Sequence, residues 1–300
     1  MLNIKKYAAI DIGSNAVRLL ISNIIEQEDN PTIFKKNSLV RVPIRLGADV
    51  FLKGEISEYN QKRMIDTMKA FSLLMDSHEV VRYKACATSA MREAKNSDNL
   101  SKIILEESGI NIDIIDGEEE ATIIAATDLN TFIDPNKTYL YVDVGGGSTE
   151  FSVIHNGTKV ISKSFKIGTV RLLNDIVKNE IWAELEQWIK DNTKVYDKLE
   201  LIGSGGNINK IFKISGKDLG KPLTYFYLTN YYKMLQNYSY EERITKLNLN
   251  QDRADVIIPA TRIYLSAMKW SGAKDIYVPK IGLSDGIIKS IYYETVKSYT

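Results

Sequence analysis

Two aspartates stand at matching places in two similar segments of the chain. Asp11 lies in AIDIGSNAVRLLI and Asp143 lies in YVDVGGGSTEFSVI, each between two aliphatic residues and just before a glycine-containing turn. Aspartate is unusual in an apolar strand, and its carboxylate is costly to bury without a partner. A cation would supply that partner, while the glycine turns would let backbone N–H groups approach an anion closely. The repeated pattern favours a metal and phosphate site over two ordinary β-turns.

A third glycine turn, in LIGSGGNINK, follows an apolar stretch and precedes an expected helix. Its spacing fits neither a Walker A loop nor a dinucleotide-binding fingerprint. Glu150, which follows the second turn, is either a further metal ligand or an exposed strand residue. The candidate phosphate-binding residues of the three turns are Gly13, Ser14 and Asn15; Gly145, Gly146, Gly147 and Ser148; and Ser204, Gly205 and Gly206.

A run of three glutamates opens an expected helix in IIDGEEEATIIAAT. Asp116 and Glu119 have the spacing of a capping box, which gives the first two glutamates an ordinary explanation. Glu120 instead heads the apolar face formed by Ile123 and Ile124. A carboxylate there faces the interior or a cleft, where burial would raise its pKa towards that of a general base. The alternative is a partly exposed acid at a helix end.

Each basic residue near these segments has two possible roles, phosphate binding or an ordinary structural one. Arg92, in ATSAMREA, falls in a first helical turn, where a cation opposes the helix dipole. It would bind phosphate oxygens together with helix N–H groups, or pair with a nearby glutamate. Lys210 and Lys213 follow the third turn and are candidate polyanion contacts, or part of a solvated face. The basic stretch over 30–46 leaves the same two choices.

The element pattern predicts an α/β protein with a duplicated architecture. A strand, a glycine turn and a second strand open each half, so we expect two lobes with a cleft between them, over 1–125 and 126–300. The last helix, about 283–297, could pack back on the first lobe. Helices are expected over 56–75, 96–107, 117–129, 182–195, 252–270 and 283–296, hairpins over 7–24 and 159–167, and strands over 80–87, 110–115, 199–202 and 275–278.

The composition narrows the function classes. The chain has 300 residues and a net charge of +1, which argues against a globally basic nucleic-acid binder. It has no apolar run long enough for a membrane span, and its start does not fit a signal peptide. One cysteine and two histidines are too few for a zinc site, so a metal here would be oxygen-bound, with magnesium favoured over manganese. We therefore expect a cytoplasmic protein without membrane or nucleic-acid partners.

Seven segments, in order across nearly the whole chain, resemble the exopolyphosphatase / guanosine pentaphosphate phosphatase family of the actin–sugar kinase–Hsp70 superfamily. They are AIDIGSNAVRLLI, ATSAMREAKNS, IIDGEEEA, VDVGGGSTEF, KIGTVRLL, IGSGGNINK and IGLSDGIIKS. The resemblance implies two ribonuclease-H-like lobes and magnesium-dependent removal of terminal phosphate from polyphosphate or guanosine pentaphosphate. It also implies a homodimer, and it corresponds to the short form without a C-terminal HD-type extension.

The resemblance also assigns roles by position. Asp143 and Glu150 would hold the metal, with Asp11 nearby, and Glu120 would be the base that orients the attacking water. Arg92 and the three glycine loops would hold phosphates. Two positions depart from the family pattern, which usually has Ser at Asp116 and Arg at Ser284.

Two other functions fit the same loops. One is an ATP-using kinase or chaperone-like ATPase of the superfamily, which would not need Glu120 at the head of its helix. The other is a non-catalytic sensor of guanosine polyphosphates, which would not need both Glu120 and Asp143.

Overall fold

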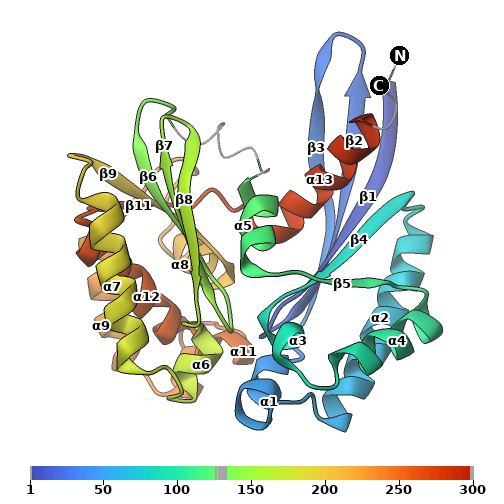
Figure 1. The fold of residues 1–300 in the computed structure, drawn as a ribbon, viewed down its shortest axis with the longest axis horizontal. Coiled ribbons are helices and arrows are strands. Elements are labelled where there is room, and N and C mark those ends of the chain that lie inside the picture. The colour runs from blue at the N-terminus through green and yellow to red at the C-terminus, as the bar shows by residue number, and fades with distance from the viewer. Residues whose placement is uncertain (1, 126, 128–133, 298–300) are drawn as a thin grey trace. The chain divides into compact units, whose positions relative to one another are not determined.

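The computed structural model describes residues 2–125, 127 and 134–297 and divides into two compact units (Figure 1). The first unit comprises Met1–Thr127 together with Leu283–Thr300, and the second comprises Asp128–Gly282. The last helix of the chain therefore belongs with the first unit. Among the described residues, no helix is both long and apolar enough to cross a bilayer.

The first unit is built on a five-stranded sheet in the order β3-β2-β1-β4-β5. The first three strands are antiparallel, and β4 and β5 continue the sheet in parallel with β1. This is the ribonuclease-H-like arrangement that the family resemblance implies. The strands are β1 (Leu2–Ile12), β2 (Val17–Gln27), β3 (Asn30–Val42), β4 (Arg82–Ala87) and β5 (Ile112–Ile114).

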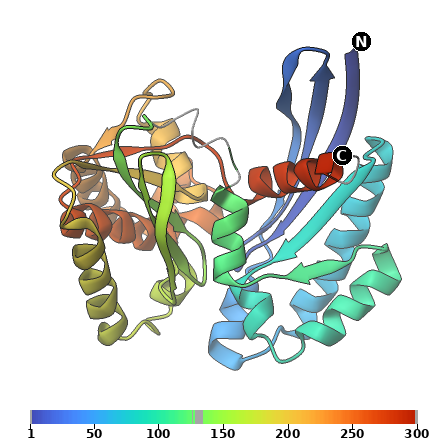
Figure 2. The same ribbon diagram turned by 45° about the horizontal axis from the view of Figure 1, so that its top comes forward.

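Alternate residues of β1 serve opposite faces of this sheet. Ala8, Ile10 and Ile12 join the core under α2 (Glu58–Ser77) and α4 (Ser97–Ser108). Tyr7, Ala9 and Asp11 therefore point to the other face. The helix α13 (Leu283–Lys297) contacts β1, β2, β4 and α5 (Gly117–Ala125), as both ribbon views show (Figures 1 and 2).

Close packing of α13 on α5 depends on a glycine. A Cβ added at Gly286 would lie 2.2 Å from the carbonyl oxygen of Ile123, so no side chain fits there. Two short helices, α1 (Leu46–Lys53) and α3 (Ser89–Glu93), complete this unit.

The second unit repeats the strand plan of the first. Its sheet has the order β10-β11-β9-β6-β7-β8, with an antiparallel meander β6-β7-β8 and with β9 parallel to β6. The duplicated α/β fold is thus confirmed. The strands are β6 (Thr138–Val144), β7 (Thr149–His155), β8 (Thr158–Phe165), β9 (Leu199–Ser204), β10 (Leu223–Thr224) and β11 (Asp275–Tyr277).

Helices on this sheet bury a separate core that includes Phe151, Leu201, Ile208 and Tyr264. They are α6 (Thr169–Leu173), α7 (Asn179–Thr193), α8 (Gly206–Ile214), α9 (Tyr225–Gln236), α10 (Tyr240–Thr245), α11 (Gln251–Ala254) and α12 (Ile257–Ser271).

Several sequence expectations need correction. The predicted hairpin over 159–167 is the single strand β8, the last strand of the meander. The predicted helix over 252–270 is two helices, α11 and α12. The basic stretch over 30–46 contains an edge strand, β3, in which Lys36 pairs with Asp285 of α13 at 2.8 Å. The end of the predicted helix over 117–129 lies outside the described residues.

Candidate phosphate and metal site

Two carboxylates face each other at the start of the β6–β7 hairpin. Asp143 near the end of β6 is the cross-strand partner of Glu150 on β7, and Glu150 is 2% exposed. Like charges directly opposite each other in an antiparallel pair are destabilising unless a cation lies with them. Mg²⁺ is usually held by one or two protein carboxylates, with water and phosphate oxygens as its other ligands. The pair therefore fits such an ion.

Hydroxyl groups fix the orientation of one of these carboxylates. Ser148 Oγ and Ser164 Oγ donate to Glu150 Oε1 at 2.6 and 3.0 Å. Such supporting bonds orient a metal ligand and lower the cost of holding it in place. Among the described residues, no group of three or more His, Cys, Asp or Glu side chains is gathered as a metal cage. A metal bound at the pair would thus take its remaining ligands from water and substrate.

Two N–H groups of the glycine loop between these strands are unpaired among the residues that the structure describes. Gly145 N donates to Ser148 O at 3.0 Å and closes the turn. The carbonyls of Gly145 and Gly146 accept from Thr169 N and Val170 N of α6, at 3.0 and 2.9 Å. Within the described part of the chain, the N–H groups at positions 146 and 147 have no hydrogen-bond partner. Successive unpaired N–H groups of this kind form an anion-binding concavity.

The third loop lies against Asp143. Ser204 is its partner in the parallel β6–β9 pair, and Gly205 has φ +116°. A Cβ at Gly205 would lie 2.9 Å from Val144 O and 3.4 Å from Asp143 Oδ1, so the loop requires glycine. The structure therefore brings Asp143, Glu150, the loop 145–148 and the loop 204–206 together in one unit.

Two buried tyrosines border this group. The Tyr264 hydroxyl donates to the carbonyl oxygen of Ser204 and supports the third loop. Burial, and to a smaller extent the nearby Asp143 carboxylate, raises the pKa of Tyr141 and of Tyr264 well above the usual value. Both phenols therefore stay neutral beside the carboxylate at physiological pH.

The first unit contains a hairpin of the same geometry with different charges. Gly13 N donates to Ala16 O at 3.2 Å, and the carbonyls of Ser14 and Asn15 accept from backbone N–H groups at the start of α1. Asp11, however, has Arg18 as its cross-strand partner, and Arg18 Nη1 donates to its carboxylate at 2.7 Å. Arginine in the first unit thus occupies the place that Glu150 occupies in the second.

Arg92 contacts the segment between β5 and α5, and Glu120 lies in the first turn of α5. Arg92 Nη1 donates to the carbonyl oxygen of Ile115 at 2.6 Å, and no ion pair with a glutamate is found for it in the described residues. Asp116 Oδ1 accepts from the N–H groups of the first two glutamates, as the capping prediction requires. Glu120 is buried at 9% exposure, on the side of α5 that was predicted to be apolar.

The two candidate lysines after the third loop lie on the same helix, α8. Lys210 Nζ donates to Asn248 O at 3.1 Å, and desolvation, with Lys213 and Arg253 nearby, lowers the pKa of Lys210. The helix α8 ends at Ile214 and carries both candidate lysines. Lys210 and Lys213 alone share this helix.

Three arginines beside the glycine loops were not among the predicted site residues. Arg18 pairs with Asp11, Arg171 Nε donates to Gly147 O at 2.7 Å, and Arg253 donates to the carbonyl oxygen of Gly206. Alignment of the two hairpins would have flagged Arg18, because Arg18 and Glu150 each follow their aspartate by the same number of residues. Nothing local in the sequence marks the other two.

Comparisons with known proteins find similarity along nearly the whole chain. The family model described as "Ppx/GppA phosphatase family" matches residues 24–294. The chain is similar to a "Bifunctional 3-dehydroquinate synthase/phosphatase" of Fusobacterium nucleatum, with 30% identity over 90% of this chain and 44% of that protein. It is also similar to a "Putative exopolyphosphatase" of Haemophilus influenzae, with 25% identity over 99% of this chain and 93% of that protein.

Among solved structures, the Aquifex aeolicus member of the Ppx/GppA family is 26% identical and has a TM-score of 0.75. The match covers 99% of this chain and 100% of that one. The extent of the family match, together with the paired glycine hairpins, shows that this chain belongs to the Ppx/GppA phosphatase family.

Proposed function

We propose that the chain is a metal-dependent phosphoanhydride hydrolase that removes terminal phosphate from inorganic polyphosphate, guanosine pentaphosphate or both. The observation that carries the proposal is the in-register pair of Asp143 and Glu150, set between two glycine loops. The similarity to an exopolyphosphatase-named relative along nearly its whole length supports the substrate class.

Each group has a proposed task in the reaction. Mg²⁺ or Mn²⁺ bound by Asp143 and Glu150 would neutralise phosphate charge. The unpaired N–H groups of the loop 145–148 would bind phosphate oxygens, as would the loops at 13–15 and 204–206. Glu120 takes the proton of the attacking water, for which its buried setting is suited. Arg92 contributes a further phosphate contact.

Asp11 has a weaker claim on the metal than the other two carboxylates. Its charge is already matched by Arg18 at 2.7 Å, so a cation there would have to compete with the guanidinium. We retain it as a contributor near the first loop rather than as a principal ligand.

The wider setting in this proposal is a cytoplasmic homodimer that acts without nucleic acid or membrane. The net charge of +1 supports the absence of a nucleic-acid partner, since a nearly neutral protein has little long-range attraction to the sugar–phosphate backbone of DNA or RNA.

A phosphate-release assay on polyphosphate, guanosine pentaphosphate and ATP tests the proposal. We expect release from one or both of the first two with Mg²⁺ or Mn²⁺, and none in excess chelator. Selective hydrolysis of ATP would favour the kinase or ATPase alternative. Tight binding of guanosine pentaphosphate without release would favour the sensor alternative.

A further inference from the structure

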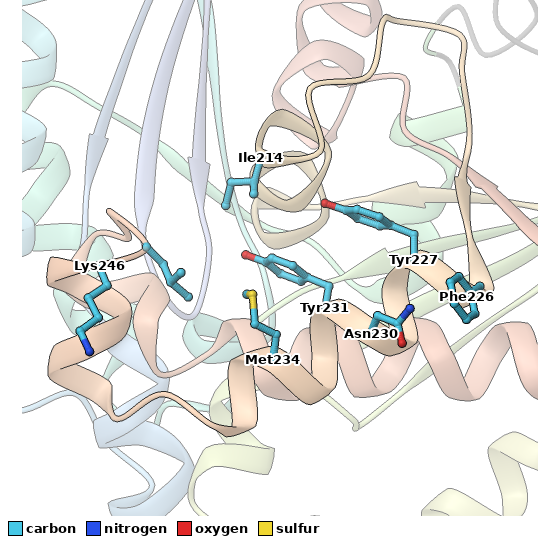
Figure 3. A pocket seen from close by; sticks show the side chains of 8 residues that line it. Ile214, Phe226, Tyr227, Asn230, Tyr231, Met234 and Lys246 are labelled. Atoms are coloured by element: carbon cyan, nitrogen blue, oxygen red, sulfur yellow. The ribbon is translucent and has the colours of Figure 1, made fainter.

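A cavity in the second unit plays no part in the site described above. It has a volume of about 700 Å³, within the usual range for small-molecule sites (Figure 3). Three segments form it: the end of α8, one face of α9 and the residues just after α10. The lining residues are Ile214, Phe226, Tyr227, Asn230, Tyr231, Met234, Lys246 and Leu247.

A parallel pair of aromatic rings forms one wall. Tyr227 and Tyr231 are one helical turn apart on α9, with ring centroids 6.2 Å apart and an interplanar angle of 7°. Figure 3 shows both rings side by side with their hydroxyl groups directed away from the helix. Phe226, which is 75% exposed, lies near the start of the same helix and also lines the cavity. Such a wall favours a planar ring, which gains from stacked or edge-on contact with aromatic neighbours.

The two tyrosine hydroxyls of the cavity are neutral donors. Neither the Tyr227 hydroxyl nor the Tyr231 hydroxyl has a hydrogen-bond partner in the described part of the chain, and Tyr231 is 7% exposed. Burial raises the pKa of Tyr227, and it raises the pKa of Tyr231 to about 12. Both hydroxyls are therefore protonated at neutral pH. They offer donors to a hydrogen-bond acceptor.

The cavity carries no uncompensated charge that would select an ion. Its cation, Lys246, pairs with Glu242 at 2.6 Å and lies over the Tyr238 ring. The other lining residues are apolar, phenolic or amide. An anion would have to draw Lys246 from its partner, and an aliphatic chain would leave the tyrosine hydroxyls unsatisfied. Both are disfavoured.

We infer that this cavity is a binding site for a neutral, planar aromatic small molecule that carries a hydrogen-bond acceptor such as a carbonyl group. Ring stacking on α9 supplies shape selection, and a tyrosine hydroxyl supplies the donor. Met234, whose side chain is flexible and polarisable, adapts the floor to the ligand. The inference is independent of the catalytic proposal.

Three small probes of matched size test this inference on the full chain. Benzamide has the required ring and carbonyl, benzoate replaces the amide by a charge, and cyclohexanecarboxamide replaces the planar ring. Titrations followed by NMR should show benzamide binding at least about tenfold more tightly than either of the others, a difference of about 1.4 kcal/mol. Absence of benzamide binding, or equal binding of all three, would overturn the inference.

Two pairs of variants locate the binding. Ile214→Trp fills the cavity from a position that is 40% exposed and should abolish benzamide binding, whereas Leu219→Trp, at an exposed position outside the lining, should not. Tyr227→Phe should weaken binding several-fold through the lost donor, while Tyr225→Phe on the same helix should leave it unchanged.

Far-UV circular dichroism and thermal melting confirm that each variant is folded. Should Ile214→Trp prove unstable, the comparison of Tyr227→Phe with Tyr225→Phe decides alone. Undiminished binding in Tyr227→Phe, or an equal loss in both tyrosine variants, would place the ligand elsewhere and refute the assignment.

Discussion

The two glycine hairpins share a backbone plan and differ in the charge placed across from the aspartate. In each, a glycine N–H closes the turn and loop carbonyls accept from the start of a short helix. In the first unit Asp11 faces Arg18, while in the second Asp143 faces Glu150. The first carboxylate has an arginine counter-ion in the protein. The second faces another carboxylate, and we propose that a cation binds there, so that the two hairpins share a fold and serve different tasks.

The two loops also differ in how a neighbouring glycine packs against them. Gly168 in the second unit approaches the backbone of its loop so closely that an added Cβ would lie 2.3 Å from Gly146 O. Gly47 in the first unit would meet mainly the Phe51 side chain, at 2.6 Å. A side chain can move aside, and a backbone carbonyl cannot do so without displacing the loop. The second loop is therefore held more tightly.

The largest expected effect concerns the base in the first unit. Glu120→Gln keeps shape and burial but removes the proton acceptor, and should lower kcat by on the order of 10² to 10⁴. Glu118→Gln, at an exposed position of the same first turn, is the control and should change little. Steady-state phosphate release measures both. Equal losses would show that the helix start, rather than one carboxylate, matters.

The second largest effect on the rate is expected from the glycine that packs against the loop 145–148. Gly168→Ala forces the loop 145–148 to shift, and a displacement of about 1 Å in a site can cost about 10²-fold in rate. Gly47→Ala should cost far less, because Phe51 can yield. Measurement of kcat/KM for the two variants checks the order. Equal losses of kcat/KM in Gly47→Ala and Gly168→Ala would contradict the view that the second loop is held more tightly than the first.

The smallest effect is expected from the lysines of α8. Replacing Lys210 and Lys213 by Gln should raise KM for long polyphosphate several-fold more than for guanosine pentaphosphate, with kcat nearly intact. The effect should shrink as salt rises, because counterions screen exposed charge over about 10 Å at 0.1 M. Lys190→Gln with Lys194→Gln, at the C-terminal end of α7 and its C-cap, serves as a matched control. A uniform change across substrates would identify the α8 lysines as an ordinary solvated face.

The fold was largely predictable because its signals are local. Apolar strands on either side of a glycine turn marked both hairpins, and Met64, Met68, Phe71 and Met75 at helical spacing marked α2, where all four are buried. The edge strand β3 was missed because its exposed, lysine-bearing sequence resembles a loop. The break between α11 and α12 was missed although Pro259 marks it, because proline is tolerated in the first turn of a helix such as α12 and disrupts a helix interior.

The site was predictable in part. The sequence identified the aspartates and the glycine loops, and the structure brings Asp143, Glu150 and two of those loops together; the roles assigned to them stay predictions. The Asp11–Arg18 ion pair depends on strand register, which composition and periodicity do not show. The cavity on α9 is formed by three segments that are separate in sequence, so no single stretch of sequence predicts it.

The most direct test of this account is a measurement of the affinity for Mn²⁺. The protein is titrated with Mn²⁺, and the free ion is quantified by its electron paramagnetic resonance signal. The account predicts that Asp143→Asn and Glu150→Gln each weaken Mn²⁺ binding at least about tenfold, or about 1.4 kcal/mol. Asp11→Asn should weaken it less, because Arg18 already pairs with that carboxylate. Binding at wild-type strength in Asp143→Asn, or the greatest loss in Asp11→Asn, would contradict it.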